Sequence, residues 1–496
     1  MTHLEARVSS NYGTLELLID GKWKRSASSQ KQAVYDPGRG TKIADVPFAG
    51  KEEVNAAVES SRTAFEKWSR RPFLERVDYL FEMRSSLEQH FDELAAMLTQ
   101  NHGKTLEESG GEVRRTIENV EAAIATAYTL AKGEGIDQVA EGIDEQMVKE
   151  PLGVFAVISP FNFPLMVPFW FLPYALVLGD TIVLKPSEID PVPTTHVVRL
   201  LVEETKLPPG VVNVIHGSKD AAEALITHRD IQGVTFVGST PVAKHIYSLA
   251  GQNGKRAIVN GGAKNSIVVM PDTRLETAIP AIISSFFGNS GQRCLAGSNL
   301  ISVGRESKSD LVAKFLGSAR KVRVGYGLEP STEMGPVISK SAKSRIEGYV
   351  ESGISDGAKL ALDGRSASVK GYPEGYYLGP TIFDGVDRGM KIAREEIFGP
   401  VASIGYAESL DGAIEMINSN TNFGNMACIF TGSGTVARKF RREVNAGNIG
   451  INVGVAFPSA YFPFGGRKES FFGVLHAQMD TVDFFADKKV IVSRWS

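Results

Sequence analysis

The stretch Gly153–Ser239, which begins GVFAVISPFNFP, decides the fold, because short apolar runs alternate in it with helical segments. A strand followed by a helix every ~20–30 residues predicts a parallel sheet covered on both faces, with ligands at the carboxyl ends of its strands. The expected strands are Gly153–Ser159, Thr181–Leu184, Val211–His216 and Val234–Val237, and the helices lie near Val167–Leu178, Thr194–Glu204, Ala221–Thr227 and Pro241–Leu249.

Both sides of this stretch extend the α/β pattern. Before it we expect two edge strands, at Leu15–Ile19 and near Ala33–Tyr35, and then helices over Lys51–Trp68, Leu74–His90 and Glu107–Ala131. After it, a second α/β unit has expected strands at Ser266–Met270, Leu300–Val303, Val401–Tyr406, Ala427–Phe430 and Asn448–Val453. Two segments fit neither unit: a hairpin at Gly133–Glu150 and a strand at Phe484–Arg494, which we expect to project and pair with a neighbouring subunit.

Composition narrows the classes of partner. A chain of 496 residues with 43% hydrophobic and 22% charged residues is typical of two or three folded domains. A net charge of −3 provides no positive field for nucleic acid or an anionic membrane. The apolar stretch Phe163–Gly179 contains three prolines and is too short to span a membrane, so we expect a buried helix. Two distant cysteines indicate no disulfide framework, and we expect a soluble cytoplasmic protein.

Cys294 and Asn162 are the candidate reacting groups. Cys294 lies in GQRC, among glycines, where a thiolate can act as a covalent nucleophile, although free cysteines are often buried and inert. Asn162 follows the first strand of the parallel sheet, and its amide can donate to a developing oxyanion or serve only as turn chemistry. The eight histidines have no zinc-like spacing, so no metal is expected.

Three segments suit a dinucleotide. Lys185 and Glu188, in KPSE, can bind ribose hydroxyls, and the carboxylate would repel a 2′-phosphate, which favours NAD over NADP. Gly238 and Ser239 open a helix whose first amides suit a pyrophosphate, although the pattern also makes an ordinary helix cap, and Gly-x-Gly-x-x-Gly is absent. In EEIFGP, Glu396 can hold a second ribose and Phe398 can pack on a flat ring.

The order of these segments resembles the aldehyde dehydrogenase superfamily over nearly the whole chain. The resemblance implies two parallel-sheet α/β domains and a small β oligomerisation arm. A NAD-binding domain would comprise residues 1–130 and 150–260, a catalytic domain with the nucleophile Cys294 residues 261–470, and the arm residues 131–149 and 471–496, in a homodimer or homotetramer. The implied cofactor-binding residues are Ser159, Phe161, Lys185, Ser187, Glu188, Gly238, Ser239, Gly261, Glu396 and Phe398.

One position favours a particular branch of the family. Hydrolytic members carry a glutamate that activates water, and here Val259 stands in its place; Phe171 stands where they often have a lysine. A thiol acceptor needs less activation than water. The pattern is similar to that of the CoA-acylating methylmalonate-semialdehyde dehydrogenases. Matching segments include GKT at 103–105, GEVRR at 111–115, GAKN at 262–265, YFPFGG at 461–466 and SFFG at 470–473.

This resemblance implies that Arg115 and Arg293 hold a substrate carboxylate, as paired guanidinium bonds would. It implies oxidation of malonate or methylmalonate semialdehyde with NAD through a Cys294 thioester, then transfer to CoA with loss of CO2, giving acetyl-CoA or propionyl-CoA. Three departures from the branch are Ala243 for glycine, Asn260 for an apolar residue and Arg467 for an aromatic. The alternatives are CoA-independent oxidation of a small aldehyde such as glyceraldehyde, a preference for NADP, and a non-catalytic binding protein on this fold.

Overall fold

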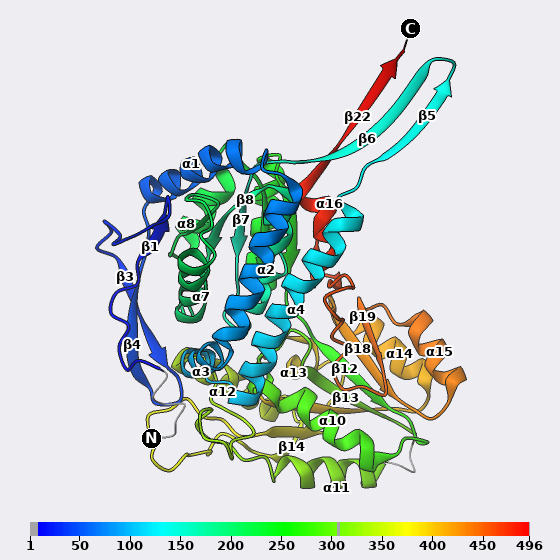
Figure 1. Cartoon of the computed structure of the whole chain (residues 1–496). Helices are drawn as coiled ribbons and strands as arrows, with labels where there is room; N and C mark the ends of the chain where they lie inside the picture. The colour runs from blue at the N-terminus through cyan, green and yellow to red at the C-terminus, as the bar shows by residue number, and fades with distance from the viewer. Residues whose placement is uncertain (1–7, 305–307, 496) are drawn as a thin grey trace.

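The computed structural model describes residues 8–304 and 308–495, which form two large sheets and a projecting arm (Figure 1). In the first sheet five strands run parallel, in the order β9 (Val212–Val214), β8 (Thr181–Lys185), β7 (Val154–Ile158), β10 (Ile231–Val237) and β11 (Arg256–Asn260). Antiparallel strands complete its edges: β1 (Leu17–Ile19) and β2 (Lys22–Lys24) beyond β9, and β21 (Phe471–Phe472) beyond β11.

Helices cover both faces of this sheet, as the apolar runs predict. Every residue of β7 is buried, and alternate side chains enter different apolar clusters because neighbouring residues of a strand point to opposite faces. One cluster joins β7 to α1 (Lys51–Trp68), α8 (Lys219–Thr227) and α9 (Thr240–Gln252). The other joins it to α2 (Phe73–Gln89), α3 (Phe91–His102), α4 (Leu106–Leu130), α6 (Leu172–Leu178) and α7 (Val192–Glu204).

The second sheet has six parallel strands. Their order is β15 (Thr381–Asp384), β16 (Val401–Ala407), β13 (Gly297–Val303), β12 (Asn265–Val269), β18 (Met426–Phe430) and β19 (Asn448–Ile451), with β14 (Lys359–Leu362) antiparallel beside β15. Around it lie α10 (Leu275–Phe287), α11 (Lys308–Ala319), α12 (Lys340–Ser355), α13 (Lys391–Arg394), α14 (Leu410–Ser419) and α15 (Gly434–Glu443). The fold is therefore the expected α/β arrangement of two parallel-sheet units.

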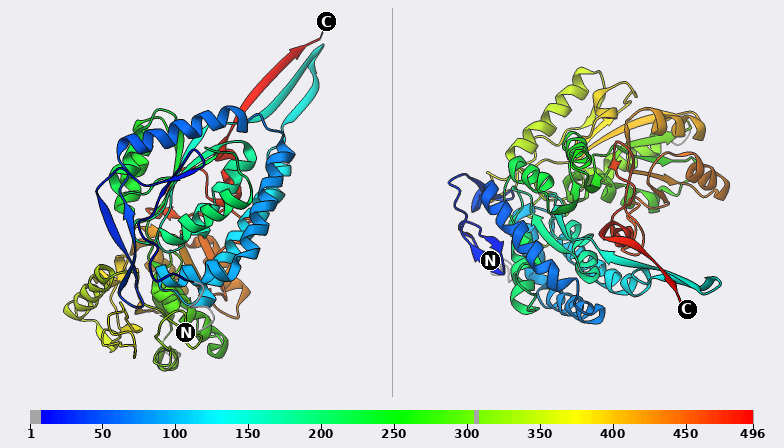
Figure 2. Two further views of the ribbon diagram at one scale, coloured as in Figure 1. Left: turned by 60° about the vertical axis from the view of Figure 1, so that its left-hand side comes forward. Right: turned by 90° about the horizontal axis from the view of Figure 1, so that it is seen from above.

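The arm is a three-stranded antiparallel sheet that extends away from both large sheets (Figures 1 and 2). It consists of β5 (Glu134–Ala140), β6 (Ile143–Pro151) and β22 (Ala486–Arg494), and β22 pairs with β6 along its whole length. The arm strand of the C-terminal region begins only at Ala486. The preceding α16 (Thr481–Phe485) buries Phe484 and Phe485 against Phe155 of β7, so the residues just before β22 belong to the core of the first unit.

Some local expectations were wrong. The strand at Leu17–Ile19 is not at an edge, because β2 continues the sheet beyond it, and β3 (Lys31–Asp36) pairs with β4 (Thr41–Pro47) in a separate hairpin. The single helix expected in the apolar segment is two short ones, α5 (Met166–Phe169) and α6, which follow one another around Pro168 and Pro173. An internal proline lacks the amide that a continuous helix needs. No helix in the described part of the chain is long and apolar enough to cross a membrane.

Candidate active site

The candidate site lies where the chain crosses from the first sheet to the second. The crossing segment, residues 261–264, joins the end of β11 to the start of β12. Its Gly262 N–H donates to Thr240 Oγ1 at 2.8 Å, and its Ala263 N–H donates to Glu396 Oε1 at 2.7 Å. The next residue, Asn265, donates to the Cys294 carbonyl at 2.8 Å. The crossing segment therefore holds together the start of α9, the loop with Glu396 and the loop with Cys294.

The cysteine loop has a strained, closely packed backbone. Before Cys294 the chain makes a 3-10 turn, η2 (Gly288–Gly291), in which Asn289 and Ser290 adopt left-handed φ values of 52° and 51°. Gly291 follows with φ 70°, and a Cβ there would clash with the Gly399 carbonyl. Such conformations are unfavourable for non-glycine residues and persist only where their surroundings enforce them. The loop thereby fixes the direction of the half-buried Cys294 side chain.

The thiol of Cys294 is protonated at neutral pH in this state. Burial, with a smaller contribution from the charge of Glu396, raises its pKa to about 12. The backbone amides of Cys294 and Leu295 and the charge of Arg293 act in the opposite direction and lower the pKa. The two amides would stabilise a thiolate, but the effect of burial is larger, so the sulfur needs a base or an added positive charge to become reactive.

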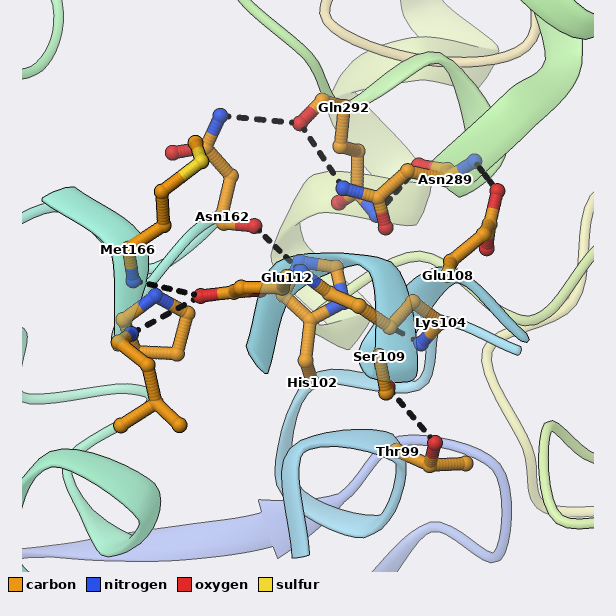
Figure 3. Close-up of polar contacts among 12 residues, drawn as sticks. Thr99, His102, Lys104, Glu108, Ser109, Glu112, Asn162, Met166, Asn289 and Gln292 are labelled. Atoms are coloured by element: carbon orange, nitrogen blue, oxygen red, sulfur yellow. Dashed lines mark hydrogen bonds and ion pairs between the residues drawn. The ribbon is translucent and has the colours of Figure 1, made fainter. Parts of the chain in front are cut away.

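Asn162 lies beside the cysteine loop, as the sequence predicts (Figure 3). Its side chain is 4% exposed, and its Nδ2 donates to the Gln292 carbonyl at 3.1 Å, two residues before Cys294. Gln292 itself is anchored, since its Oε1 accepts from the Ile338 N–H at 3.1 Å. Asn162 and Cys294 therefore lie on loops of different sheets, and a direct hydrogen bond joins the two loops.

Most of the predicted cofactor residues lie at the carboxyl edge of the first sheet, and Glu396 and Phe398 come from the loop before β16 of the second sheet. Lys185 ends β8; its ammonium donates to the Gly217 carbonyl at 2.6 Å and lies 3.5 Å from the partly exposed Glu188 carboxylate. At the start of α9, Ser239 is exposed and its side chain makes no cap hydrogen bond, so the first helix amides are open to an anion. Ser159 directly follows β7 and is buried, as is Ser187, while Gly238 is partly exposed.

Aromatic and glycine residues shape the other end of this edge. The Phe161 ring lies edge-on to Phe398, with ring centroids 5.8 Å apart. Gly261 and Gly262 leave room for neighbouring groups: a Cβ on Gly262 would lie 2.6 Å from Glu396 Oε2. Open helix amides at one end and the Glu396 carboxylate with the Phe161 and Phe398 rings at the other fit a dinucleotide, and the predicted cofactor-binding residues stay a prediction.

The two predicted carboxylate-binding arginines do not contact each other. Arg293 donates to Glu108 at 2.7 Å and lines a cavity of about 670 Å³. Arg115 donates to Glu118 at 2.6 Å, and its guanidinium carbon lies 5.2 Å from the centre of the Phe457 ring. The neighbouring Arg114 is more exposed and pairs with Glu88 on α2, away from this face. The register of α4 thus directs Arg115 toward Phe457 and Arg114 toward α2.

The positions that differ from hydrolytic relatives are apolar and buried. Val259 and Phe171 are 0% and 1% exposed and pack in apolar clusters, so neither position supplies a base.

Two of the departures from the semialdehyde branch are polar. Asn260, beside Val259, is 4% exposed, and its side-chain amide has no hydrogen-bond partner among the described residues. Arg467 is exposed and reaches Asn445 at 3.4 Å, so its side chain meets a surface asparagine.

Sequence reasoning missed several buried charged residues around the site. Lys264, in the crossing segment, is 3% exposed, and burial lowers its pKa to about 7, against the raising effect of Glu396. Burial likewise raises the pKa of Glu396 to about 7. Lys104 and Glu112 form a buried ion pair behind Asn162. Their motifs were visible, but burial is a tertiary property that a single charged letter does not reveal. The described residues contain no His, Cys, Asp and Glu cluster able to hold a metal ion.

Fold and site together define a two-sheet α/β protein. A half-buried cysteine lies on a constrained loop at the junction of its sheets. The aldehyde dehydrogenase family matches residues 23–491, and the chain belongs to that family of oxidoreductases. A malonate-semialdehyde dehydrogenase of Geobacillus thermodenitrificans is 43% identical, over 97% of this chain and 99% of that protein.

Solved structures agree with this assignment. The crystal structure of a methylmalonate-semialdehyde dehydrogenase from Oceanimonas doudoroffii is 39% identical, with a TM-score of 0.95 over 98% of this chain and 99% of that one. A proposed methylmalonate-semialdehyde dehydrogenase of Sinorhizobium meliloti, in complex with NAD, is 38% identical, with a TM-score of 0.96 over 99% of both chains. The expected superfamily and fold are therefore confirmed, and so is the resemblance to the semialdehyde branch.

Proposed function

We propose that this protein oxidises a short carboxylated semialdehyde, malonate or methylmalonate semialdehyde, with NAD, and transfers the acyl group to CoA. The names of the relatives, at 43% identity over nearly the full length, support the substrate class, and the NAD complex of a close structural neighbour supports the cofactor. Glu188 at the end of β8 supports NAD over NADP, because a carboxylate repels a 2′-phosphate.

In the first half-reaction the Cys294 thiol gives up its proton to a base or to water, and the resulting thiolate attacks the aldehyde carbon. The oxyanion that forms is stabilised by Asn162 Nδ2 and by the Cys294 N–H, at a point where burial strengthens each bond. Bound NAD supplies the hydride acceptor; Glu396 would hold its nicotinamide-side ribose, while Lys185 and Glu188 hold the other ribose. Loss of the hydride from the former aldehyde carbon leaves a thioester on Cys294.

In the second half-reaction a thiol attacks the thioester carbonyl and takes the acyl group, and the Cys294 sulfur leaves; the carboxylate of the acyl group is lost as CO2, and a proton takes its place. The observation that carries this choice is the burial of Val259 in the apolar core, at the position where hydrolytic relatives have a water-activating base. A CoA thiol is far more acidic than water and attacks with less help. Malonate semialdehyde would give acetyl-CoA, CO2 and NADH, and methylmalonate semialdehyde would give propionyl-CoA.

The deciding experiment follows NADH formation from malonate semialdehyde with and without CoA, and identifies the products by mass. We expect steady turnover only with CoA, with acetyl-CoA as the product; without CoA, one burst of NADH per active site should be followed by slow turnover. Rapid steady turnover without CoA would reject the acylating function and favour oxidation to a free acid. Absence of any aldehyde-dependent reduction of NAD or NADP would indicate a binding protein.

We also propose that the arm joins copies of the chain into a homodimer or homotetramer. Val490, Val492 and Ile136 on the arm are each more than half exposed, and an apolar surface of this kind is typical of an interaction site. Two free cysteines fit the reducing cytoplasm, where we place the protein. Light scattering of the intact protein, compared with a Val490→Glu/Val492→Glu variant, tests the assembly; an unchanged mass would contradict the role of the arm.

A further inference from the structure

A buried ion pair lies directly behind the candidate oxyanion donor (Figure 3). The Lys104 ammonium lies 2.5 Å from Glu112 Oε2 and donates at 2.7 Å to the main-chain carbonyl of Asn162. The side chains of Lys104 and Glu112 are 1% and 0% exposed. The Lys104 ammonium also lies 4.5 Å from the centre of the Phe163 ring. One cation therefore holds Asn162 and the residue after it.

The carboxylate of Glu112 fastens the other end of the same loop. While Oε2 binds Lys104, Oε1 accepts the Leu165 N–H at 2.9 Å and the Met166 N–H at 3.2 Å. Glu112 lies in α4, and Lys104 lies just before that helix begins. The loop from Asn162 to Met166 is thus bound to α4 at both of its ends by one charged pair.

The neighbouring helical turn holds the cysteine loop. Glu108, four residues before Glu112 and so on the same face of α4, accepts the Asn289 N–H at 2.6 Å and pairs with Arg293 at 2.7 Å. Consecutive turns of one helix therefore fix the loop of Asn162 and the loop of Cys294. A rigid helix face sets the spacing between the two loops.

Two further ionisable groups near the pair, Asp190 and His102, are buried as well. Asp190 is fully buried, neither carboxylate oxygen has a hydrogen-bond partner among the described residues, and burial raises its pKa well above the usual range. His102 is fully buried too, and burial lowers its pKa well below the usual range. Burial thus disfavours the charged form of both groups, while Lys104 and Glu112 are paired with each other. A buried pair of this kind is weak evidence for stability but is able to specify one geometry.

We propose that Lys104 and Glu112 are positioning residues that hold Asn162 in place to donate to the oxyanion during acylation of Cys294. This inference rests on the proposed roles of Asn162 and Cys294. Lys104 forms a hydrogen bond with the main-chain carbonyl of Asn162, and Glu112 accepts hydrogen bonds from the main-chain N–H groups of Leu165 and Met166. These bonds fix the backbone at Asn162 and so direct its side-chain amide toward the cysteine loop. Misplacement of a reacting group by about 1 Å costs on the order of 10²-fold in rate.

The test measures the single-turnover rate of NADH formation, which reports the first half-reaction without CoA. Asn162→Ala should lower this rate by about 10²–10³-fold. Lys104→Met/Glu112→Gln removes both charges together and keeps an acceptor for the Leu165 and Met166 amides, so we expect it to fold and to lose about 10–100-fold. Affinity for NADH and the alkylation rate of Cys294 should stay near wild type.

Non-additivity separates positioning from a general loss of structure. The triple variant, which combines Asn162→Ala with Lys104→Met/Glu112→Gln, should form NADH almost as fast as Asn162→Ala alone. The reason is that the ion pair acts through Asn162. Asp180→Asn is the matched control. Asp180 is a fully buried carboxylate that accepts two consecutive amides, those of Leu152 and Gly153, at the opposite end of β7. This control should lower stability and leave the acylation rate unchanged.

Each outcome has one meaning. A normal rate in the Lys104→Met/Glu112→Gln variant, together with a slow Asn162→Ala, would overturn the positioning role and leave the proposed function intact. Fully additive losses would also overturn it. A normal rate in Asn162→Ala would refute the proposed oxyanion donor itself. If the paired variant does not fold, Glu112→Gln alone, which keeps an acceptor oxygen for the Leu165 and Met166 N–H groups, must still slow acylation at unchanged NADH affinity.

Discussion

Replacing Lys264 with methionine should stabilise the protein near neutral pH. Its ammonium is buried, and no described residue forms a hydrogen bond with it. Burial lowers the pKa of Lys264 from 10.5 to about 7, a difference of 3.5 pKa units, which corresponds to about 5 kcal/mol of lost stability when the folded state must carry the charge. The attraction to Glu396 is already included in this pKa; imperfect packing of the new methionine offsets part of the gain, so we expect about 1–4 kcal/mol.

The pH dependence of this effect has a definite sign. The unfolded chain keeps the Lys264 proton up to about pH 10.5, whereas the folded chain keeps it only to about pH 7. As the pH falls from about 10.5 to 7, Lys264 binds its proton only in the unfolded chain. The free energy of unfolding of the wild-type protein therefore decreases over this range. The advantage of Lys264→Met should be largest at and below pH 7 and shrink toward pH 10, while Glu396, Glu395 and the nearby Arg345 remain in both proteins.

The measurement is denaturant unfolding of wild type and Lys264→Met at about pH 6.5 and pH 9.5. The difference between their free energies of unfolding at each pH removes the effect of titrating groups that both proteins share. Lys104→Met is the matched control, because this second buried lysine has a carboxylate and a carbonyl as partners and its loss leaves Glu112 unpaired. It should destabilise at both pH values, by about 3–5 kcal/mol. A Lys264→Met protein no more stable than wild type at pH 6.5, or with a gain that does not change with pH, would refute the reasoning.

Three further predictions concern the site. Because the pKa of Cys294 is about 12, alkylation of the free protein by iodoacetamide should rise steadily from about pH 7 to 10, and a plateau near pH 8 would contradict that pKa. Arg115→Ala should raise KM for malonate semialdehyde about 10–100-fold and spare propanal, with the outward Arg114→Ala as control; equal losses on both substrates would exclude a carboxylate contact. Since the pKa of Glu396 is about 7, NADH affinity should rise as the pH increases through 7 and become pH-independent in Glu396→Gln, and a profile shared by both proteins would rule this out.

Much of the fold could be predicted because its signal is local. The strands β7, β8 and β10 are fully or nearly fully buried on two faces, so their sequences read as unbroken apolar runs. The helix Lys51–Trp68 was predicted to the residue, since an amphipathic surface helix repeats its apolar positions. By contrast β14 and β15 lie among turns and gave no clear run. Pairing of β22 with β6 inside one chain depends on contacts far apart in sequence, which no local pattern contains.

The site was predictable to the extent that its residues lie at strand ends or in glycine-rich turns, which is true of Asn162, Lys185, Ser239 and Cys294. The residues that orient them were not, because a lysine in GKT or GAKN reads as an exposed charge. Only tertiary packing distinguishes Lys104, which has a carboxylate partner, from Lys264, which has no hydrogen-bond partner among the described residues. That difference gives the two residues opposite expected effects on stability when each is replaced by methionine.

One face of α4 holds both loops and also carries Arg115, which we propose binds the substrate carboxylate. Glu108, Glu112 and Arg115 are spaced at i, i+4 and i+7, which places them along one side of a helix. The first holds the cysteine loop, the second holds the asparagine loop, and the third lies over Phe457. If Arg115 binds the substrate carboxylate, α4 holds one end of the substrate and also sets the distance between the proposed nucleophile and the proposed oxyanion donor. A short substrate with its charge close to the reacting carbonyl is the kind that such an arrangement selects, since a longer chain would place its carboxylate beyond the third residue of the stripe.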